Sequence, residues 1–171
     1  PDECQKIIEL GLSIQPELSL TANSLQINKE IRNSKNSWFK PEYEEAHWIF
    51  RKCTDIVLDM NERFFQFDLD YIESLQFTMY DEDNTFYKKH IDSGYNDASA
   101  SRKLTFSIQL SNPIDYDGGN LLLYTSDFPT EVMKDQGIMN LFPSYTLHEV
   151  TPITKGKRYS LVGWVHGPKF K

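Results

Sequence analysis

Hydrophobic residues recur at steps of three and four in the stretch PEYEEAHWIFRKCTDIVLDMNERFF, residues 41–65. This spacing predicts one long amphipathic α-helix. Pro41 suits its first turn, and the acidic residues that follow suit the positive end of the helix dipole. The predicted apolar face contains Ala46, Ile49, Phe50, Cys53, Ile56, Val57, Met60 and Phe64.

The chain before this helix gives weaker signals. A shorter helix is predicted over about residues 2–12. A strand is predicted within residues 25–34, and it leads into a predicted loop over residues 33–41, NSKNSWFKP.

From Leu75 onward the hydrophobic pattern has a period of two, which is typical of β-strands. Segments rich in Gly, Asn, Asp, Ser and Pro separate the strands and predict turns. Short strands behind a helical first part predict a sandwich or jelly roll. The predicted strands cover residues 75–80, 86–92, 103–110, 120–126, 137–142, 146–150 and 158–166.

Two of these strands have one apolar and one polar face. In residues 103–110 the side chains of Thr105, Ser107 and Gln109 lie opposite an apolar face of Leu104, Phe106, Ile108 and Leu110. In residues 75–80 the polar face holds Gln76, Thr78 and Tyr80. Such faces either contact solvent or line an internal cavity that holds a small ligand.

Composition limits the class of protein. A chain of 171 residues with 39% hydrophobic residues is long enough for one domain with a substantial core. Its net charge of −7 disfavours nucleic acid or an anionic membrane as the main partner. Cys4 and Cys53 are expected to be two buried thiols. No membrane-spanning or secretory pattern is found, so a cytoplasmic location is expected.

The segment FYKKHIDSGY, residues 86–95, contains His90 and Asp92. In an extended strand these two side chains project to the same side, so they can bind one metal ion together. A third ligand must come from elsewhere in the chain. His148 lies in a predicted strand close to turn residues and is preferred over His47, on the predicted helix, and over His166.

Arg158 follows His148 by ten residues and is expected to return towards it after a turn. A guanidinium group on the buried side of a strand needs an anion, and its planar fork suits a carboxylate. Two histidines and one carboxylate fit both a non-haem Fe(II) oxygenase and a catalytic zinc site. Arg158 favours iron, because an oxygenase that uses a keto diacid must hold the distal carboxylate.

Three stretches carry a family resemblance: MYDEDNTFYKKHIDS, RKLTFSIQLSNPIDYDGGNLLLY and LHEVTPITKGKRYSLVGW. They resemble the 2-oxoglutarate and Fe(II)-dependent dioxygenases, and more narrowly the prolyl 4-hydroxylase-like branch with its PKHD-type hydroxylases. The resemblance covers roughly residues 30–167. It implies a double-stranded β-helix, a jelly roll related to the cupins, over residues 71–168. A mostly helical support region over residues 1–70 would complete a single domain, residues 1–171.

The resemblance also implies roles for particular side chains. His90, Asp92 and His148 would bind Fe(II), and Arg158 would pair with the distal carboxylate of 2-oxoglutarate. Three further positions are candidates for contact with the cosubstrate: Tyr80, Gln109 and Ser160. Three more are candidates for contact with the substrate: Tyr87, Arg102 and Trp164. Core packing is the alternative for Tyr87 and Trp164, and an exposed charge is the alternative for Arg102.

The activity implied by the resemblance is hydroxylation of an unactivated C–H bond, with decarboxylation of 2-oxoglutarate to succinate and CO2. A peptidyl prolyl residue of a peptide or protein is the expected substrate, and O2 is the second cosubstrate. Ascorbate (vitamin C) is a candidate accessory reductant. Two alternatives stay open: a hydroxylase of a free amino acid or other small molecule, and a cupin-like binding protein without turnover.

Overall fold

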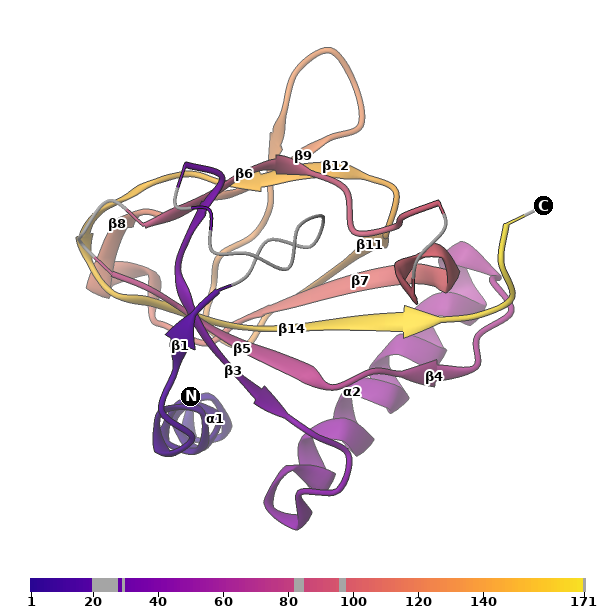
Figure 1. Cartoon of the computed structure of the whole chain (residues 1–171), viewed down its shortest axis with the longest axis horizontal. Helices are drawn as coiled ribbons and strands as arrows, with labels where there is room; N and C mark the ends of the chain where they lie inside the picture. Colours follow the sequence, from indigo (N-terminus) through magenta and orange to yellow (C-terminus); the bar gives the residue numbers. More distant parts are fainter. Residues whose placement is uncertain (20–27, 29, 82–84, 96–97, 171) are drawn as a thin grey trace.

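The structure is a computed structural model that describes residues 1–19, 28, 30–81, 85–95 and 98–170. It has three layers, with a small β-sheet above a large one and two helices below (Figure 1). The helices are α1, Asp2–Ser13, and α2, His47–Met60, which continues into the π-helical turn η2, Asn61–Phe65. Three short 3-10 segments are η1, Glu44–Ala46; η3, Ala98–Ser101; and η4, Pro113–Asp115.

The large sheet has seven strands, and all of its pairings are antiparallel. Six strands follow the order β1-β3-β5-β14-β7-β11, and β4 pairs with β14 beside β5. The bounds are β1, Glu17–Leu18; β3, Lys35–Phe39; β4, Tyr71–Ile72; β5, Leu75–Tyr80; β7, Arg102–Gln109; β11, Met139–Pro143; and β14, Arg158–His166.

A five-stranded antiparallel sheet has the order β10-β9-β12-β6-β2, and a separate pair joins β13 to β8. The bounds are β2, Arg32–Asn33; β6, Phe86–His90; β8, Tyr116–Gly118; β9, Leu121–Tyr124; β10, Thr130–Glu131; β12, Leu147–Val150; and β13, Ile153–Gly156. These sheets form the expected double-stranded β-helix, a jelly roll.

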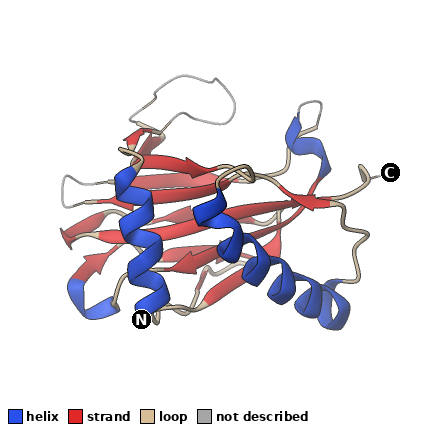
Figure 2. Ribbon diagram, turned by 90° about the horizontal axis from the view of Figure 1, so that it is seen from below, coloured by secondary structure: helices blue, strands red, loops and turns tan. Residues whose placement is uncertain are grey.

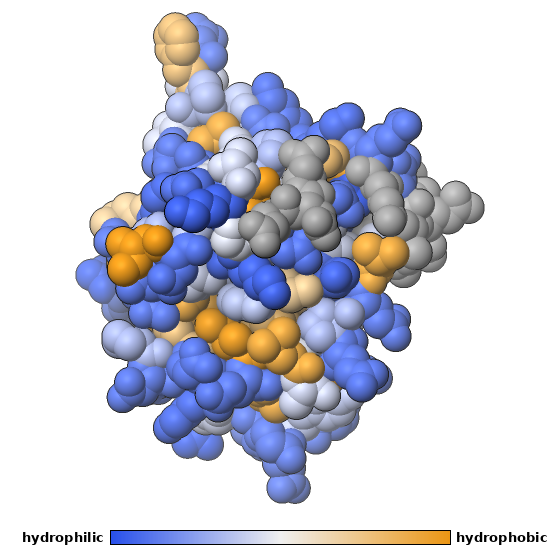
Figure 3. Space-filling view, turned by 90° about the vertical axis from the view of Figure 1, so that its left-hand side faces the viewer, coloured by the Kyte–Doolittle hydropathy of each residue, from blue (hydrophilic) through white to orange (hydrophobic). Residues whose placement is uncertain are grey.

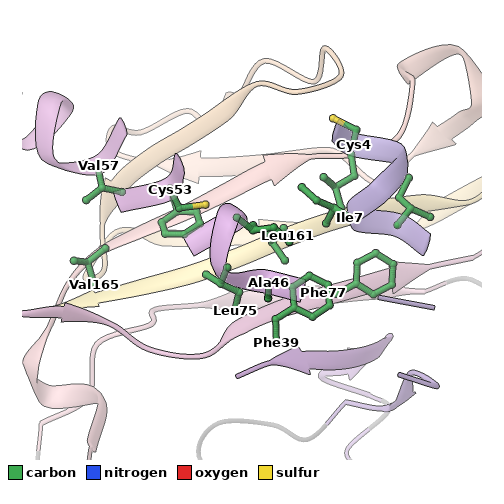
Figure 4. Packing of buried hydrophobic residues seen from close by; sticks show 14 of the residues in the cluster. Cys4, Ile7, Phe39, Ala46, Cys53, Val57, Leu75, Phe77, Leu161 and Val165 are labelled. Carbon is green, nitrogen blue, oxygen red and sulfur yellow. The ribbon is translucent and has the colours of Figure 1, made fainter. Parts of the chain in front are cut away.

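Both helices pack on the same face of the large sheet (Figure 2). The packed stripe of α2 follows steps of four, through Ile49, Cys53 and Val57, and these residues meet Leu161 and Val165 of β14 in the main core. Figure 4 shows this core from close by, with Cys4 and Ile7 of α1 and with Phe39, Leu75 and Phe77 of the sheet. The fully packed interior therefore lies on the helix side.

The sequence predicted both helices correctly, with differences at their ends. The chain enters α2 through η1, so Pro41 lies before the helix rather than in its first turn. The assignment of two residues to the buried apolar face is wrong, because the side chain of Ile56 is 45% exposed and that of Phe64 is 65% exposed. Ile56 lies beside the stripe of Ile49, Cys53 and Val57, and Phe64 lies in the π-helical turn, none of whose residues is buried. The two cysteines are free and buried, as expected.

All seven predicted strands are present, and β5 and β14 have the predicted bounds. The predicted loop over residues 33–41 is wrong, because β3 occupies its centre. Two predicted turns, residues 111–119 and 151–157, contain β8 and β13. Most of the strand predicted within residues 25–34 lies outside the described residues, and its end forms β2.

The face of the molecule shown in Figure 3 is mostly hydrophilic, with a small apolar patch near its centre. No helix within the described part of the chain is long and apolar enough to cross a membrane.

Candidate active site

A cavity of about 470 Å³ separates the large sheet from the five-stranded sheet, and residues of both sheets line it. From the two polar faces found in the sequence, Gln76, Tyr80, Thr105 and Ser107 contribute to its wall. The cavity interpretation of these faces is therefore correct, and solvent exposure is wrong. The other cavity residues used below are Arg32, Trp38, Tyr87, His90, Asp92, Arg102, His148, Arg158, Ser160 and Trp164.

Two neighbouring strands place the predicted metal ligands together. In the antiparallel pair β6–β12, His90 lies directly opposite His148, and Asp92 follows two residues later. The His90 Nε2 atom is 3.6 Å from Asp92 Oδ1, and the His148 Nε2 atom is 3.4 Å from Asp92 Oδ2. All three ligand atoms lie within 4.8 Å of one another. The structure thus brings together the three side chains that the sequence singled out.

The second nitrogen of each histidine ring is held by the backbone. His90 Nδ1 lies 2.7 Å from the Lys88 carbonyl oxygen, and His148 Nδ1 lies 2.8 Å from the Thr146 carbonyl oxygen. A carbonyl only accepts hydrogen bonds, so each Nδ1 carries a proton, and Nε2 is the ring atom that faces Asp92. This is the tautomer that metal-binding histidines use, and it is commonly fixed by such a contact.

The protonation states of His90 and Asp92 suit the binding of a cation. Burial, together with the neighbouring His148, lowers the pKa of His90 to about 4, so this ring is neutral at neutral pH. Burial alone would raise the pKa of Asp92, but the adjacent His148 and His90 outweigh it and the pKa falls below its ordinary value. A neutral imidazole at His90 and an ionised carboxylate at Asp92 are the forms in which these groups bind metal.

A residue of the large sheet also holds the Asp92 carboxylate in place by a hydrogen bond. Asp92 Oδ2 accepts a hydrogen bond of 2.9 Å from the Thr105 hydroxyl, whose oxygen lies 3.0 Å from Ser144 Oγ. Asp92 is 9% exposed and Thr105 1%. The donor set, its protonation and its supporting contacts therefore fit a divalent ion such as Fe(II) or Zn²⁺.

Arg158 lies at the start of β14 in the large sheet, and both it and His148 of the five-stranded sheet line the cavity. Its Nε donates to Gln109 Oε1 at 3.0 Å, and its Nη1 lies 3.5 Å from Ser160 Oγ. The guanidinium carbon is 5.4 Å from the centre of the Tyr80 ring. The four predicted cosubstrate positions, Tyr80, Gln109, Arg158 and Ser160, therefore form one buried group.

The predicted substrate positions all line the same cavity. The Tyr87 ring stacks on His90 with 3.5 Å between ring centroids. The Arg102 guanidinium lies 4.2 Å from the centre of the Trp164 ring, pairs with Glu73 and donates to the Asp92 carbonyl oxygen. The exposed-charge reading of Arg102 is therefore wrong.

Trp38 and Arg32 are cavity residues that the sequence did not reveal. Trp38 of β3 lies 6.0 Å from Trp164 between ring centroids, and the Arg32 guanidinium lies 4.6 Å from the centre of the Tyr87 ring. Both lie within or next to the segment predicted as a loop, where the alternation that marks a cavity wall is too short to recognise.

The remaining histidines lie away from the metal ligands. His47 is exposed, and its Nε2 lies 2.9 Å from the Pro41 carbonyl oxygen. His166 is buried and lies between Ser101 Oγ, at 2.8 Å, and Glu73 Oε2, at 3.1 Å. The preference for His148 over both agrees with this arrangement.

A model of the 2OG-Fe(II) oxygenase superfamily matches residues 75–166, a stretch that contains His90, Asp92, His148 and Arg158. The chain belongs to this superfamily of oxygenase enzymes, as the three motifs indicated.

Within the superfamily, the chain falls in the PKHD-type, prolyl 4-hydroxylase-like branch. A PKHD-type hydroxylase of Hyphomonas neptunium is 45% identical over 83 residues, which cover 46% of this chain and 37% of that relative. A PKHD-type hydroxylase of Prochlorococcus marinus strain MIT 9515 is 30% identical over 166 residues, covering 94% of this chain and 72% of the relative. The match to the first relative thus spans well under two thirds of its length.

A solved structure supports the fold. The prolyl hydroxylase of Trichoplax adhaerens, determined in complex with a hypoxia inducible factor oxygen degradation domain peptide fragment, superimposes with a TM-score of 0.77. Its sequence identity is 22%, and the match covers 96% of this chain and 79% of that one.

Proposed function

We propose that this chain is a 2-oxoglutarate- and Fe(II)-dependent hydroxylase of a peptidyl prolyl residue. In the net reaction, O2 gives one oxygen atom to the C–H bond of the substrate and one to 2-oxoglutarate, which becomes succinate and CO2. The observation that carries the proposal is the convergence of His90, Asp92 and His148 in a cavity that also contains Arg158.

In this proposal His90, Asp92 and His148 hold Fe(II), which supplies the activation of O2 when it is bound. The Nδ1 contacts to the backbone keep both imidazole rings oriented, and Thr105 keeps the carboxylate oriented. Arg158 pairs with the distal carboxylate of 2-oxoglutarate through charge-assisted hydrogen bonds. Tyr80, beside the guanidinium, contributes to the same cosubstrate site.

Aromatic rings support the choice of substrate. Trp38, Tyr87 and Trp164 line the cavity on both sheets, and a proline ring is apolar and compact enough to pack between such rings and exclude water. Arg102 shapes this wall through its stacking on Trp164. The names of the relatives, and a solved prolyl hydroxylase with a bound peptide, support a peptide or protein as substrate.

We also propose that residues 1–171 act as one dioxygenase unit, with residues 1–70 as support for a core over residues 71–168. Core contacts between α1, α2 and the large sheet support this assignment. Ascorbate is proposed as an accessory reductant.

The first test measures succinate formed from 2-oxoglutarate with Fe(II) and O2. His148→Ala is expected to lower the rate more than about 100-fold, because losing a ligand costs more than the 10- to 100-fold that follows loss of a ligand's hydrogen-bond partner. His47→Ala is the matched control, since this exposed histidine lies outside the cavity. Equal rates in His148→Ala and the unchanged protein would refute the assignment of the metal site.

The second test incubates the protein with a library of proline-containing peptides and with free amino acids, and follows the products by mass spectrometry. A peptide that gains one oxygen at proline supports the proposal. Oxygen incorporation into a free amino acid alone would establish a small-molecule hydroxylase, and absence of succinate under all conditions would favour a binding protein.

A further inference from the structure

Behind Arg158 lies a buried chain of three polar side chains. The guanidinium Nε donates to Gln109 Oε1 at 3.0 Å, and Gln109 Nε2 donates to the Tyr116 hydroxyl oxygen at 2.9 Å. Gln109 Nε2 also lies 3.3 Å from the Ser111 carbonyl oxygen. Arg158 is 4% exposed, and Gln109 and Tyr116 are each 3% exposed. The amide is thus fixed at both ends, with its oxygen on the guanidinium and its nitrogen on the phenol.

The two-stranded sheet β8–β13 positions the phenol. Tyr116 of β8 pairs with Gly156 of β13, two residues before Arg158. Gly156 has a φ of +72°, and a Cβ there would lie 2.1 Å from the Asp115 carbonyl oxygen and 3.1 Å from Tyr116 Cα. Glycine is therefore required for this close approach. The sheet ties the position of Tyr116 to the start of β14.

A second glycine makes room for the arginine side chain itself. Gly119, three residues after Tyr116, has a φ of +60°. A Cβ at this position would lie 3.0 Å from Arg158 Cδ and 2.3 Å from Ile153 Cδ1. The segment from Tyr116 to Gly119 therefore contacts Arg158 at two points, through its aliphatic stem and, by way of Gln109, through its Nε.

Resting on the proposed function, in which Arg158 binds the distal carboxylate of 2-oxoglutarate, we propose that Tyr116 is a positioning residue for Arg158 that acts through Gln109. Arginine has many rotamers, and holding the side chain before the ligand arrives reduces the entropy lost on binding. Tyr116 does not line the cavity, so its effect reaches the cosubstrate through the Arg158 guanidinium, which the Gln109 amide connects to the phenol. The sheet β8–β13 is then part of the cosubstrate site without touching the cosubstrate.

The protonation state of the phenol suits this role. Burial raises the pKa of Tyr116, while the charge of Arg158 and the polar interaction of the phenol with that side chain act in the opposite direction and only reduce the increase. The hydroxyl is therefore neutral at neutral pH. Because the Arg158 Nε only donates, it directs the Gln109 amide oxygen towards itself, and the amide nitrogen donates to the phenol oxygen.

The test is Tyr116→Phe, which removes the hydroxyl and keeps the ring. Calorimetry with Mn(II) in place of Fe(II) measures the dissociation constant of 2-oxoglutarate, and steady-state kinetics measure its KM. Both constants are expected to rise roughly tenfold, the ratio that corresponds to about 1.4 kcal/mol. The kcat at saturating 2-oxoglutarate is expected to stay within about twofold, because the metal ligands do not contact Tyr116.

Tyr159→Phe is the matched control. It makes the same chemical change one residue from Arg158, but the Tyr159 ring packs on Phe77 of the main core, with 5.6 Å between ring centroids. The cosubstrate 2-oxobutyrate lacks the distal carboxylate, so its dissociation constant is expected to be equal in Tyr116→Phe and the unchanged protein. Equal weakening of both keto acids, with a lower melting temperature, would show a structural defect and overturn the proposal.

A double-mutant cycle tests whether the effect passes through the amide. In a Gln109→Met background, Tyr116→Phe is expected to change the dissociation constant less than about twofold, because the connection is already broken. Full additivity would refute the route through Gln109. If the unchanged protein binds no 2-oxoglutarate, the proposed function itself is wrong; if it binds but Tyr116→Phe binds equally well, only the role of Tyr116 is wrong.

Discussion

The two faces of strand β7 differ in chemistry but not in burial. Leu104 and Phe106 are 0% exposed on the helix side, where they join the main core closed by α1 and α2. Thr105 and Gln109, on the cavity side, are 1% and 3% exposed. Exposure alone therefore does not distinguish core from site in this sheet. The two faces differ in the interactions that hold their buried side chains in place.

On the helix side, the side chains are held in place by close packing. Opposite Phe106, a Cβ on Gly163 would lie 2.2 Å from the ring, so the two strands leave no spare volume there. On the cavity side, Thr105 and Gln109 are held by hydrogen bonds to Asp92 and Arg158. One face thus contributes stability through buried apolar area, and the other fixes the orientation of groups that bind ligands.

The strongest test of this comparison removes a large side chain from the apolar face. Phe106→Ala is expected to lower the free energy of unfolding by about 3–5 kcal/mol, because it leaves a cavity in a closely packed core. Urea denaturation followed by circular dichroism measures the change. Phe128→Ala is the control, since Phe128 is 80% exposed and its loss should change stability by less than about 0.5 kcal/mol.

A loss below about 1 kcal/mol in Phe106→Ala would mean that the helix side is less tightly packed than the structure indicates. The contrast between the two faces of β7 would then disappear.

The second test changes the neighbouring position on the polar face. Thr105→Val keeps the shape of the side chain but removes the hydroxyl that donates to Asp92 at 2.9 Å. Metal affinity is expected to fall about 10- to 100-fold, the usual cost of losing a partner of a ligand. Calorimetric titration with Mn(II) measures it. Unchanged metal affinity would show that Thr105 does not orient the carboxylate.

Ser107→Ala provides the matched control, because Ser107 lies on the same face of β7 and lines the cavity. It contacts none of the three metal ligands through a hydrogen bond within the part of the chain that the structure describes, so metal affinity should be unchanged in this variant.

The fold was predictable where the hydrophobic period is long. The six residues of β5 alternate clearly, and the nine residues of β14 form a long, mostly apolar stretch; the bounds of both strands match the prediction. The segments β8 and β13 have three and four residues, too few for a period of two to stand out among turn residues. Their pairing depends on Gly156 meeting Tyr116 across the chain, which no local pattern encodes.

The metal site was predictable because its residue types are rare and its geometry is partly local. His90 and Asp92 are two positions apart on one side of the chain, and only the pairing of β6 with β12 adds His148. The surroundings of Arg102 were not predictable. Its partner Glu73 lies 29 residues away and also contacts His166, 93 residues further along, so only the folded chain brings these charges together.

The smallest expected effect is a pH dependence that originates in the apolar core. Cys53 is 2% exposed on α2, and burial raises the pKa of its thiol from 9.0 to about 12. Above pH 9 the unfolded chain loses this proton while the folded chain keeps it, so the free energy of unfolding falls as pH rises. The fall is at most about 1.4 kcal/mol per pH unit for one group. Urea denaturation between pH 9 and 10.5 measures how the free energy of unfolding depends on pH. Cys53→Val should remove the contribution of this thiol to that dependence, whereas Ile56→Val, at an exposed position, should leave the dependence unchanged. An equal dependence on pH in both variants would show that burial does not shift the pKa of Cys53.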